Sequence, residues 1–275
     1  IFINEKISIE KLDSLFFYMV VAILLGARIG HFLFYDPEFL IKKPLEVFLP
    51  FQFSPTFKFT GFAGLASHGA AIGAIISMYL YSKKVLKKPI LYILDRIVIP
   101  SALGAMFVRL GNLMNSEIVG VRTESESGFF YEHKAKNQIA SFFSVDSDKI
   151  HLNETSMDTT IKDIKYSQLK VSVPLGNKKM NPYYSEAFSS AFNFQAIDSD
   201  ADFFSSNDKN DFIVSSTNEL ILPIYIIPRI PTQLYEAISY WLIFCFLFWG
   251  YWKRDWYLYS GKLFGAFFTL LFASR

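Results

Sequence analysis

Three arginines lie in strongly apolar segments, where a cation is costly. Arg28 lies in LFFYMVVAILLGARIGHFLF, Arg109 follows IVIPSALGAMFV, and Arg275 ends the chain after an apolar run. A guanidinium group costs ~2.5 kcal/mol or more at the centre of a membrane, and less toward the interface. A group with several negatively charged oxygens would offset that cost, and guanidinium grips such a group through two N–H bonds. The three residues therefore indicate a site for a lipid phosphate.

A histidine and a group of polar residues occupy two other apolar segments. His68 stands in GLASHGAAIG, about nine residues below the predicted outer end of its span. A histidine at that depth usually has a function, although it could instead be neutral and bonded to a backbone carbonyl. Gln233, Tyr235 and Glu236, in PTQLYEA, begin a span with polar groups at its outer rim. They either bind a ligand or act as interfacial anchors.

Two small-residue motifs accompany these candidates. Gly69 and Gly73 form a GxxxG pattern beside His68, and Gly26 and Gly30 repeat that spacing around Arg28. Such glycines allow membrane helices to approach closely. We expect them to pack helices together and to crowd the histidine and the arginines around one cavity.

The composition is that of a membrane protein. The chain has 275 residues, 52% of them hydrophobic, with 30 Phe and 15 Tyr, and its mean hydropathy is +0.27. These values are too apolar for an ordinary soluble domain. The single Cys245 excludes an internal disulfide, no ligand cluster for a metal is present, and no Lys/Arg block indicates nucleic acid.

About five segments are long enough to span a bilayer, which takes ~20 mostly apolar residues. They are 15–34, 59–81, 89–113, 234–252 and 259–275. The chain begins at Ile1 and stops inside an apolar run, so we expect further helices beyond both ends. The predicted fold is therefore an all-α multi-pass membrane bundle, with about five spans present.

Basic residues in the short loops predict the orientation of the bundle. SKKVLKKP (82–89) joins the second and third spans, and KRD (253–255) joins the fourth and fifth. Lys/Arg excess marks the cytoplasmic side. Arg28 then lies 13 residues after Leu15, Arg109 lies 13 after Arg96, and Arg275 lies 13 after Lys262, or roughly 20 Å along each helix. One such arginine could equally snorkel to the surface, whereas three at one depth favour a shared anionic ligand.

The long segment between the third and fourth spans differs in composition. Residues 121–228 are rich in Ser, Asn, Asp and Lys and contain no span. Alternating runs at 168–173 and 212–216 predict strands. We expect a small β-rich head outside the membrane, between membrane parts at 1–120 and 229–275.

Five stretches, in this order, closely resemble bacterial prolipoprotein diacylglyceryl transferases. They are GARIGHFLFYDPEF, GLASHGAAIG, RLGNLMNSEIVG, PTQLYEA and GKLFGAFFTLLFASR. RLGNLMNSEIVG corresponds to the signature of that family. The resemblance covers nearly all the membrane part, while 121–228 carries no family motif.

The resemblance implies an inner-membrane enzyme of about seven spans, with the head on the periplasmic face and no cofactor. Members of the family move the diacylglyceryl group of phosphatidylglycerol onto the lipobox cysteine thiol in the signal peptide of a prolipoprotein. Glycerol phosphate is released. The bilayer and these two substrates are the implied partners.

The resemblance also assigns roles to individual residues. Arg109 matches an essential phospholipid-binding arginine, Arg275 a second essential arginine, and His68 an important histidine. The neighbours of Arg109 in the signature are matched by Asn112, Glu117 and Gly120. One position departs from the family, because Ile230 stands where a histidine usually precedes PTQLYEA.

These residues support one mechanism. Arg109 and Arg275, with Arg28 as a weaker choice, would face the phosphate leaving group. His68 would either accept the proton of the thiol, whose pKa is ~8.5, or only orient the lipid. Two rival interpretations are a transporter of an organic phosphate or lipid, in which buried arginines line an anion path, and a membrane anchor that presents the head to a partner.

Overall fold

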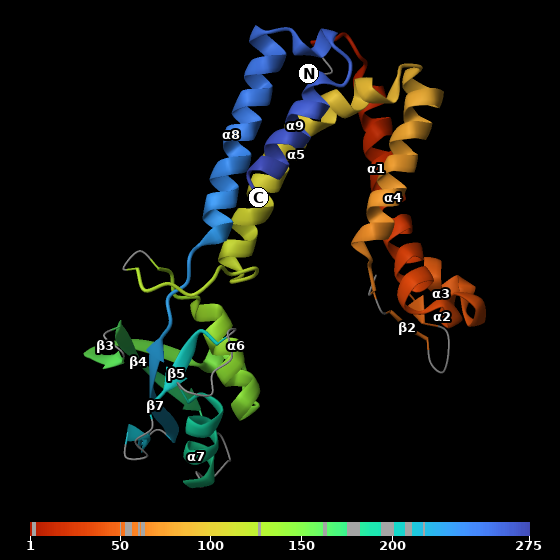
Figure 1. Cartoon of the computed structure of the whole chain (residues 1–275). Coiled ribbons are helices and arrows are strands. Elements are labelled where there is room, and N and C mark those ends of the chain that lie inside the picture. Colours follow the sequence, from red (N-terminus) through yellow and green to blue (C-terminus); the bar gives the residue numbers. More distant parts are fainter. Residues whose placement is uncertain are drawn as a thin grey trace. The chain divides into compact units, whose positions relative to one another are not determined.

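The structure is a computed structural model of the whole chain (Figure 1). It describes residues 1, 4–49, 51–52, 57–59, 61, 64–125, 128–161, 164–174, 182–193, 201–206, 211–216 and 218–275. These residues form two compact units. The first contains Ile1–Ala102 and Ile243–Arg275, and the second contains Leu103–Leu242.

Two helices of the first unit, α1 (Ile9–Tyr35) and α4 (Ser67–Tyr81), run side by side (Figure 1). Glycines form the contact, because a Cβ added to Gly30 would lie 2.6 Å from the Cα of Gly69. The backbone N–H of Ala66 also donates to the carbonyl of Ala27 at 3.0 Å. The predicted packing of the two GxxxG motifs is therefore confirmed.

Gly30→Ala should lower the stability of this unit. The new methyl group would overlap backbone rather than a movable side chain, and overpacking of this kind costs ~1–3 kcal/mol. Gly104→Ala is the matched control, since its Cβ would have no described heavy atom within 4 Å and alanine favours a helix over glycine by ~1 kcal/mol. Thermal unfolding in detergent should show a lower midpoint for Gly30→Ala alone. Equal shifts in both variants would contradict the glycine contact.

Short elements connect α1 to α4. They are α2 (Pro37–Lys42), α3 (Pro44–Phe48), β1 (Phe51–Gln52) and β2 (Lys58–Phe59), with β1 and β2 antiparallel. The predicted span 59–81 is therefore wrong at its start, because residue 59 lies in a strand and the helix begins at Ser67. Gly61 and Gly64 adopt φ of 65° and 77°, values that end helical geometry and that hydropathy alone does not reveal.

The remaining helices of the chain's membrane part are α5 (Ile90–Met114), α8 (Thr232–Lys253) and α9 (Lys262–Ala273). A π-helical turn, Ser82–Leu86, links α4 to α5, and a 3₁₀ turn, Trp256–Leu258, precedes α9. Of the described helices, α1, α5 and α8 are long and apolar enough to cross a membrane. Crossing by α4, with 15 residues, and by α9, with 12, stays a prediction.

One carboxylate joins three segments of the first unit. Glu5 accepts hydrogen bonds from the guanidinium of Arg96, at 2.9 Å, and from the hydroxyls of Tyr92 and Tyr251. Burial alone would raise the pKa of the Glu5 carboxyl, but these hydrogen bonds outweigh it and hold the pKa below its ordinary value. A second carboxylate, that of Asp95, caps the start of α9 by accepting the backbone N–H groups of Gly261 and Phe264 at 2.6 and 2.8 Å.

Among the described residues of the second unit, an antiparallel sheet and two helices follow the end of α5 and precede the start of α8 in the chain. The strands are β3 (His151–Ile161), β4 (Ile164–Pro174), β5 (Phe203–Ser205), β6 (Ile213–Val214) and β7 (Glu219–Ile226). Their order is β3-β4-β7-β5, and β6 also pairs with β7. The strands predicted at 168–173 and within 212–216 are confirmed.

The helices of this unit, α6 (Glu132–Phe143) and α7 (Pro182–Ala191), lie against the sheet (Figure 1). The buried face of α6 includes Ala135 and Ile139, which pack with Val171 of β4 and Leu222 of β7 in one hydrophobic core. This core makes the head a mixed α/β structure. The alternating sequence pattern predicts only its strands.

Candidate functional site

The second unit brings two of the predicted site residues into direct contact. Arg109 lies on α5 and Glu236 lies in the first turns of α8, and the Nε of Arg109 is 2.5 Å from Oε2 of Glu236. Their side chains are 13% and 27% exposed. Such a charge-assisted pair is much stronger than one on an open surface. The carboxylate therefore fixes the guanidinium from its Nε side.

Gln233 ties the loop after α5 to the head. Its side-chain Nε2 donates to the backbone carbonyl of Glu117 at 2.6 Å, and its Oε1 accepts the hydroxyl of Tyr131 at 2.8 Å. The Gln233 residue is only 1% exposed. A buried amide with both ends bonded is a rigid connector, so Gln233 acts through the loop backbone in this structure.

Gln233→Leu should destabilise the second unit more than Tyr131→Phe does. Leucine leaves the Tyr131 hydroxyl and the Glu117 carbonyl unpaired, whereas Tyr131→Phe leaves only the side-chain oxygen of Gln233 unpaired. Each buried polar group without a partner costs ~1–3 kcal/mol of stability. Burial raises the pKa of the Tyr131 hydroxyl, so this bond is intact at neutral pH. Thermal unfolding in detergent measures the two midpoints. A larger loss for Tyr131→Phe would show that Gln233 does not hold both partners.

Gly120 ends the signature stretch in a tight contact. A Cβ at this position would overlap the backbone carbonyl oxygen of Ile230 and lie 2.8 Å from Cγ2 of Thr232. The carbonyl of Gly120 accepts a hydrogen bond from Arg229 at 3.0 Å. Arg229 is itself buried and paired with Asp202. The sequence offered no signal for the Arg229–Asp202 pair, which lies outside every motif that the resemblance supplied.

Between α5 and Gly120, the loop has an unusual backbone. Ser116 and Ile118 have φ of 57° and 53°, and a positive φ at a β-branched residue is rare. The carbonyl of Asn112 accepts the backbone N–H of Glu117 at 2.8 Å, which closes the end of α5. Asn112 and Glu117 are therefore brought together by their backbones.

Arg28 has protein partners rather than an open guanidinium. It is 6% exposed, and it donates to the backbone carbonyls of Val47 at 2.9 Å and Glu46 at 3.1 Å. Its guanidinium carbon also lies 4.8 Å from the ring centre of Phe32. These contacts give Arg28 a structural task, because they hold the end of α3 against α1.

The other predicted site residues are exposed. His68 lies in the first turn of α4, Tyr235 at the start of α8, and Arg275 after the end of α9. His68, Arg28 and Arg275 belong to the first unit, and Arg109 and its partners belong to the second. Within the second unit the structure joins Arg109 to Glu236, and Gln233 to Glu117.

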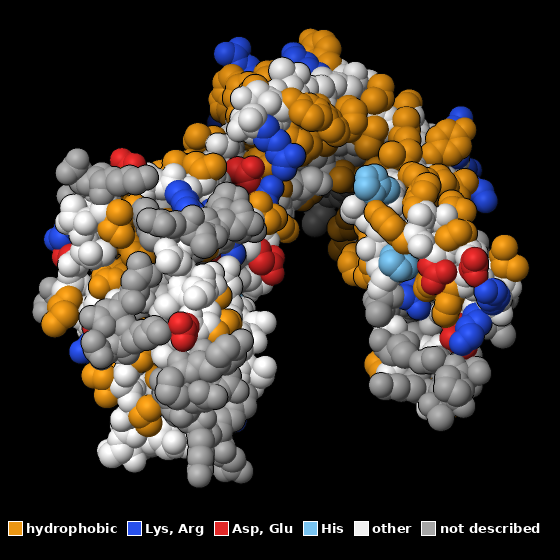
Figure 2. Space-filling model, turned by 60° about the horizontal axis from the view of Figure 1, so that its bottom comes forward, with side chains coloured by type: hydrophobic (Ala, Val, Ile, Leu, Met, Phe, Trp, Pro, Cys, Tyr) orange, Lys and Arg blue, Asp and Glu red, His pale blue; other side chains and the backbone are white. Residues whose placement is uncertain are grey.

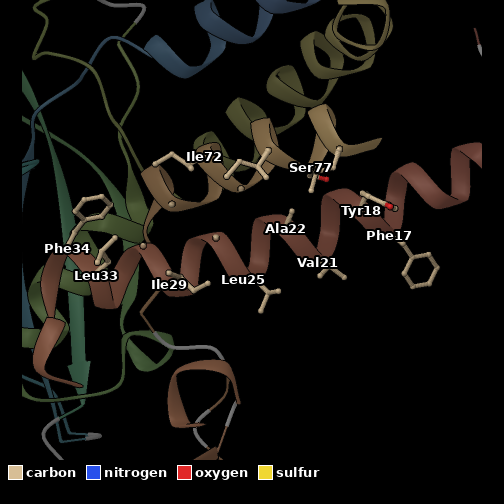
Figure 3. A pocket seen from close by; sticks show the side chains of 16 residues that line it. Phe17, Tyr18, Val21, Ala22, Leu25, Ile29, Leu33, Phe34, Ile72 and Ser77 are labelled. Atoms are coloured by element: carbon tan, nitrogen blue, oxygen red, sulfur yellow. The ribbon is translucent and has the colours of Figure 1, made fainter. Parts of the chain in front are cut away.

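An apolar groove of about 620 Å³ follows the contact between α1 and α4 (Figure 3). Figure 3 shows Phe17, Val21 and Leu25 along α1, with Ile72 and Ser77 on α4. Hydrophobic side chains also cover much of the outside of this unit (Figure 2), including exposed Phe16, Ile75 and Ile76. Large exposed apolar surfaces of this kind mark contact with a membrane.

Comparison with known proteins gives a consistent result. A family described as prolipoprotein diacylglyceryl transferase matches residues 2–275. A phosphatidylglycerol–prolipoprotein diacylglyceryl transferase of Porphyromonas gingivalis is 29% identical over 273 residues, which are 99% of this chain and 64% of that protein. The protein of the same name from Bacteroides fragilis is 45% identical over 131 residues, 47% of each chain.

A further relative of that name, from Chloroherpeton thalassium, is 28% identical over 275 residues, which are 100% of this chain and 65% of that protein. The chain therefore spans slightly less than two thirds of the length of the two relatives that match it throughout. None of these names describes a transporter, so the transporter alternative has no support among them.

Proposed function

Because the chain belongs to the prolipoprotein diacylglyceryl transferase family, we propose that it is an integral membrane protein with the corresponding transferase activity. It would move the diacylglyceryl group of phosphatidylglycerol to the lipobox cysteine thiol of a prolipoprotein. The new bond joins the thiol sulfur to a glycerol carbon, and the bond from that carbon to the phosphate oxygen breaks. The thiol proton is released to a base, and glycerol phosphate leaves.

The observation that carries this proposal is the orientation of Arg109. Glu236 engages the Nε of Arg109, and the two terminal nitrogens of a guanidinium can then grip two phosphate oxygens bidentately. Among the described residues of the second unit, Glu236 is the only ion-pair partner of Arg109. Negative charge grows on the phosphate as it leaves, and a preorganised cation stabilises that charge.

The surrounding residues support this role by restricting the loop. Gln233 and Gly120 fix the backbone after α5 through the contacts described above. Asn112 lies about one helical turn after Arg109 on α5, and Glu117 follows in the loop, within the same signature stretch. Tyr235, the exposed residue directly before Glu236, would face the lipid or the acceptor peptide.

On the family resemblance, Arg275 is proposed as a second cation and His68 as the candidate general base. Arg28 is the weakest candidate of the three arginines, because backbone carbonyls already bind its guanidinium. The pH–rate profile of His68→Gln, compared with that of the unaltered protein, tests the role of the histidine. If the two profiles are the same, His68 is not the base and can only orient the lipid.

The orientation is also a proposal. The lysines of the turn between α4 and α5, together with Lys253 and Arg254 after α8, support a cytoplasmic location for these two connections. Residues 121–228 would then form a periplasmic head inserted between membrane parts 1–120 and 229–275 of an inner-membrane protein.

The test is incubation of the full-length protein in lipid with radiolabelled phosphatidylglycerol and a peptide that contains a lipobox. The expected result is radiolabel on the peptide, attached through its cysteine. A peptide with Ser in place of that cysteine is the control and should stay unlabelled. Absence of label on the cysteine peptide, with folded protein present, would refute the transferase activity.

A further inference from the structure

A polar cleft of about 840 Å³ lies in the second unit, between the loop after α5 and the outward face of α6. Residues 115–117 form one wall, and these belong to the signature stretch that contains Arg109. The cleft lies outside the helices long enough to span a membrane. It is therefore accessible from water, close in sequence to the proposed phosphate site.

The second wall is one face of an amphipathic helix. His133 and Asn137 lie four residues apart on α6 and line the cleft, with Gln138 beside them. On the opposite face, Ala135 and Ile139 are fully buried in the hydrophobic core of the head. The core therefore fixes the direction in which the polar residues point.

Gln138, one of the residues that line the cleft, has a buried side-chain oxygen without a hydrogen-bond partner among the described residues. This atom, Oε1, has almost no accessible surface. An unpaired buried amide group is destabilising, and native proteins rarely keep one without a ligand or water. The described residues therefore leave the Gln138 amide unsatisfied, and its C=O and N–H groups can bond a ligand once the side chain turns toward the cleft.

The mixture of groups selects the class of ligand. Asn115, Asn137 and Gln138 each offer both N–H donors and a carbonyl acceptor, which matches the alternating N–H and C=O groups of an extended polypeptide. The carboxylate of Glu117, at the same cleft, disfavours a phosphate or another anion. Lys134, on the α6 wall, already pairs with Asp202 at 3.1 Å.

We propose that this cleft binds the polar segment that follows the acceptor cysteine in the prolipoprotein, an inference that rests on the proposed function. The signal peptide before the cysteine is apolar, whereas the cleft is polar. Asn115 follows Arg109 by six residues and lies directly after the end of α5, which is roughly 9 Å at the helical rise. An extended chain advances ~3.3 Å per residue, so about three residues after the cysteine reach the cleft.

The test compares two fluorescent lipobox peptides that end one or eight uncharged polar residues after the cysteine. Their affinities for the full-length protein in lipid nanodiscs are measured by fluorescence anisotropy. The longer peptide should bind about tenfold more tightly, equivalent to about 1.4 kcal/mol. The double variant Asn137→Ala/Gln138→Leu should remove that gain. Asn137→Ala alone should reduce it, and because Asn137 is exposed, this substitution should leave the fold intact.

Asn153→Ala is the matched control, because Asn153 is an exposed asparagine of β3 outside the cleft. It should keep the full tenfold gain. Equal affinities of the two peptides for the unaltered protein, or a gain that survives in the double variant, would overturn the cleft proposal. Lipid transfer in the same samples bears on the transferase activity alone, since the binding measurement needs no turnover.

Discussion

Arg109→Ala, introduced into the full-length protein, abolishes diacylglyceryl transfer while the protein still inserts and folds. The loss is at least 100-fold in rate, because removal of one preorganised donor from a developing anion typically costs ~10²–10³ in kcat. Radiolabel transferred from phosphatidylglycerol to a lipobox peptide measures it. Transfer at the normal rate would exclude Arg109 from the reaction.

Arg109→Lys and Glu236→Gln sharpen this experiment. Lysine keeps the charge but cannot present two N–H groups to one phosphate while a third engages Glu236, so we expect it to fail almost as completely. Glu236→Gln keeps a hydrogen-bond acceptor near Nε but loses the ionic part of the pair, so we expect an intermediate loss. A rate for Arg109→Lys close to that of the unaltered protein would show that only charge matters at this position.

Gly120→Ala gives the second large effect. Its methyl group would meet the carbonyl oxygen of Ile230 and crowd Thr232, and neither backbone segment can yield without moving the start of α8. We expect a loss of ~1–3 kcal/mol in stability from overpacking, together with a strong fall in transfer, because Arg109 and Glu236 are held from these two segments. Thermal unfolding and radiolabel transfer are measured on the same preparation.

Gly111→Ala is the matched control for this variant. Gly111 belongs to the same signature stretch, yet a Cβ there would have no described heavy atom within 4 Å. We expect its thermal midpoint to stay unchanged or to rise, since alanine favours the helix. If Gly111→Ala destabilised the protein as much as Gly120→Ala, the contact with Ile230 would not be the cause.

The sequence predicted the residue types of the site better than their partners. The free-energy cost of a cation in an apolar helix predicts that both Arg109 and Arg28 need a partner. It does not predict which group that partner is. For Arg109 the partner is the carboxylate of Glu236, 127 positions later in the chain. For Arg28 it is a pair of backbone carbonyls. Every residue has a backbone carbonyl, so the sequence does not show which ones bind a side chain.

The predicted boundaries of elements were wrong where backbone conformation, rather than hydropathy, determined where a helix begins. The span containing His68 was placed eight residues too early, because its first part is as apolar as a helix but contains two glycines with positive φ. Helix α6 was overlooked for the opposite reason. Its composition is polar, although the spacing of Ala135, Ile139 and Phe143 follows the helical repeat and was available to find it.

The carboxylate of Glu5 has a consequence for the order in which the chain assembles. Its partner Arg96 is 91 residues away, and its partner Tyr251 is 246 residues away. Ribosomes add ~5–20 residues per second, so Tyr251 is made roughly 8–31 s after Arg96. Until then the carboxylate lacks one of its donors. The segment before α1 therefore reaches its final set of bonds only when α8 has been synthesised.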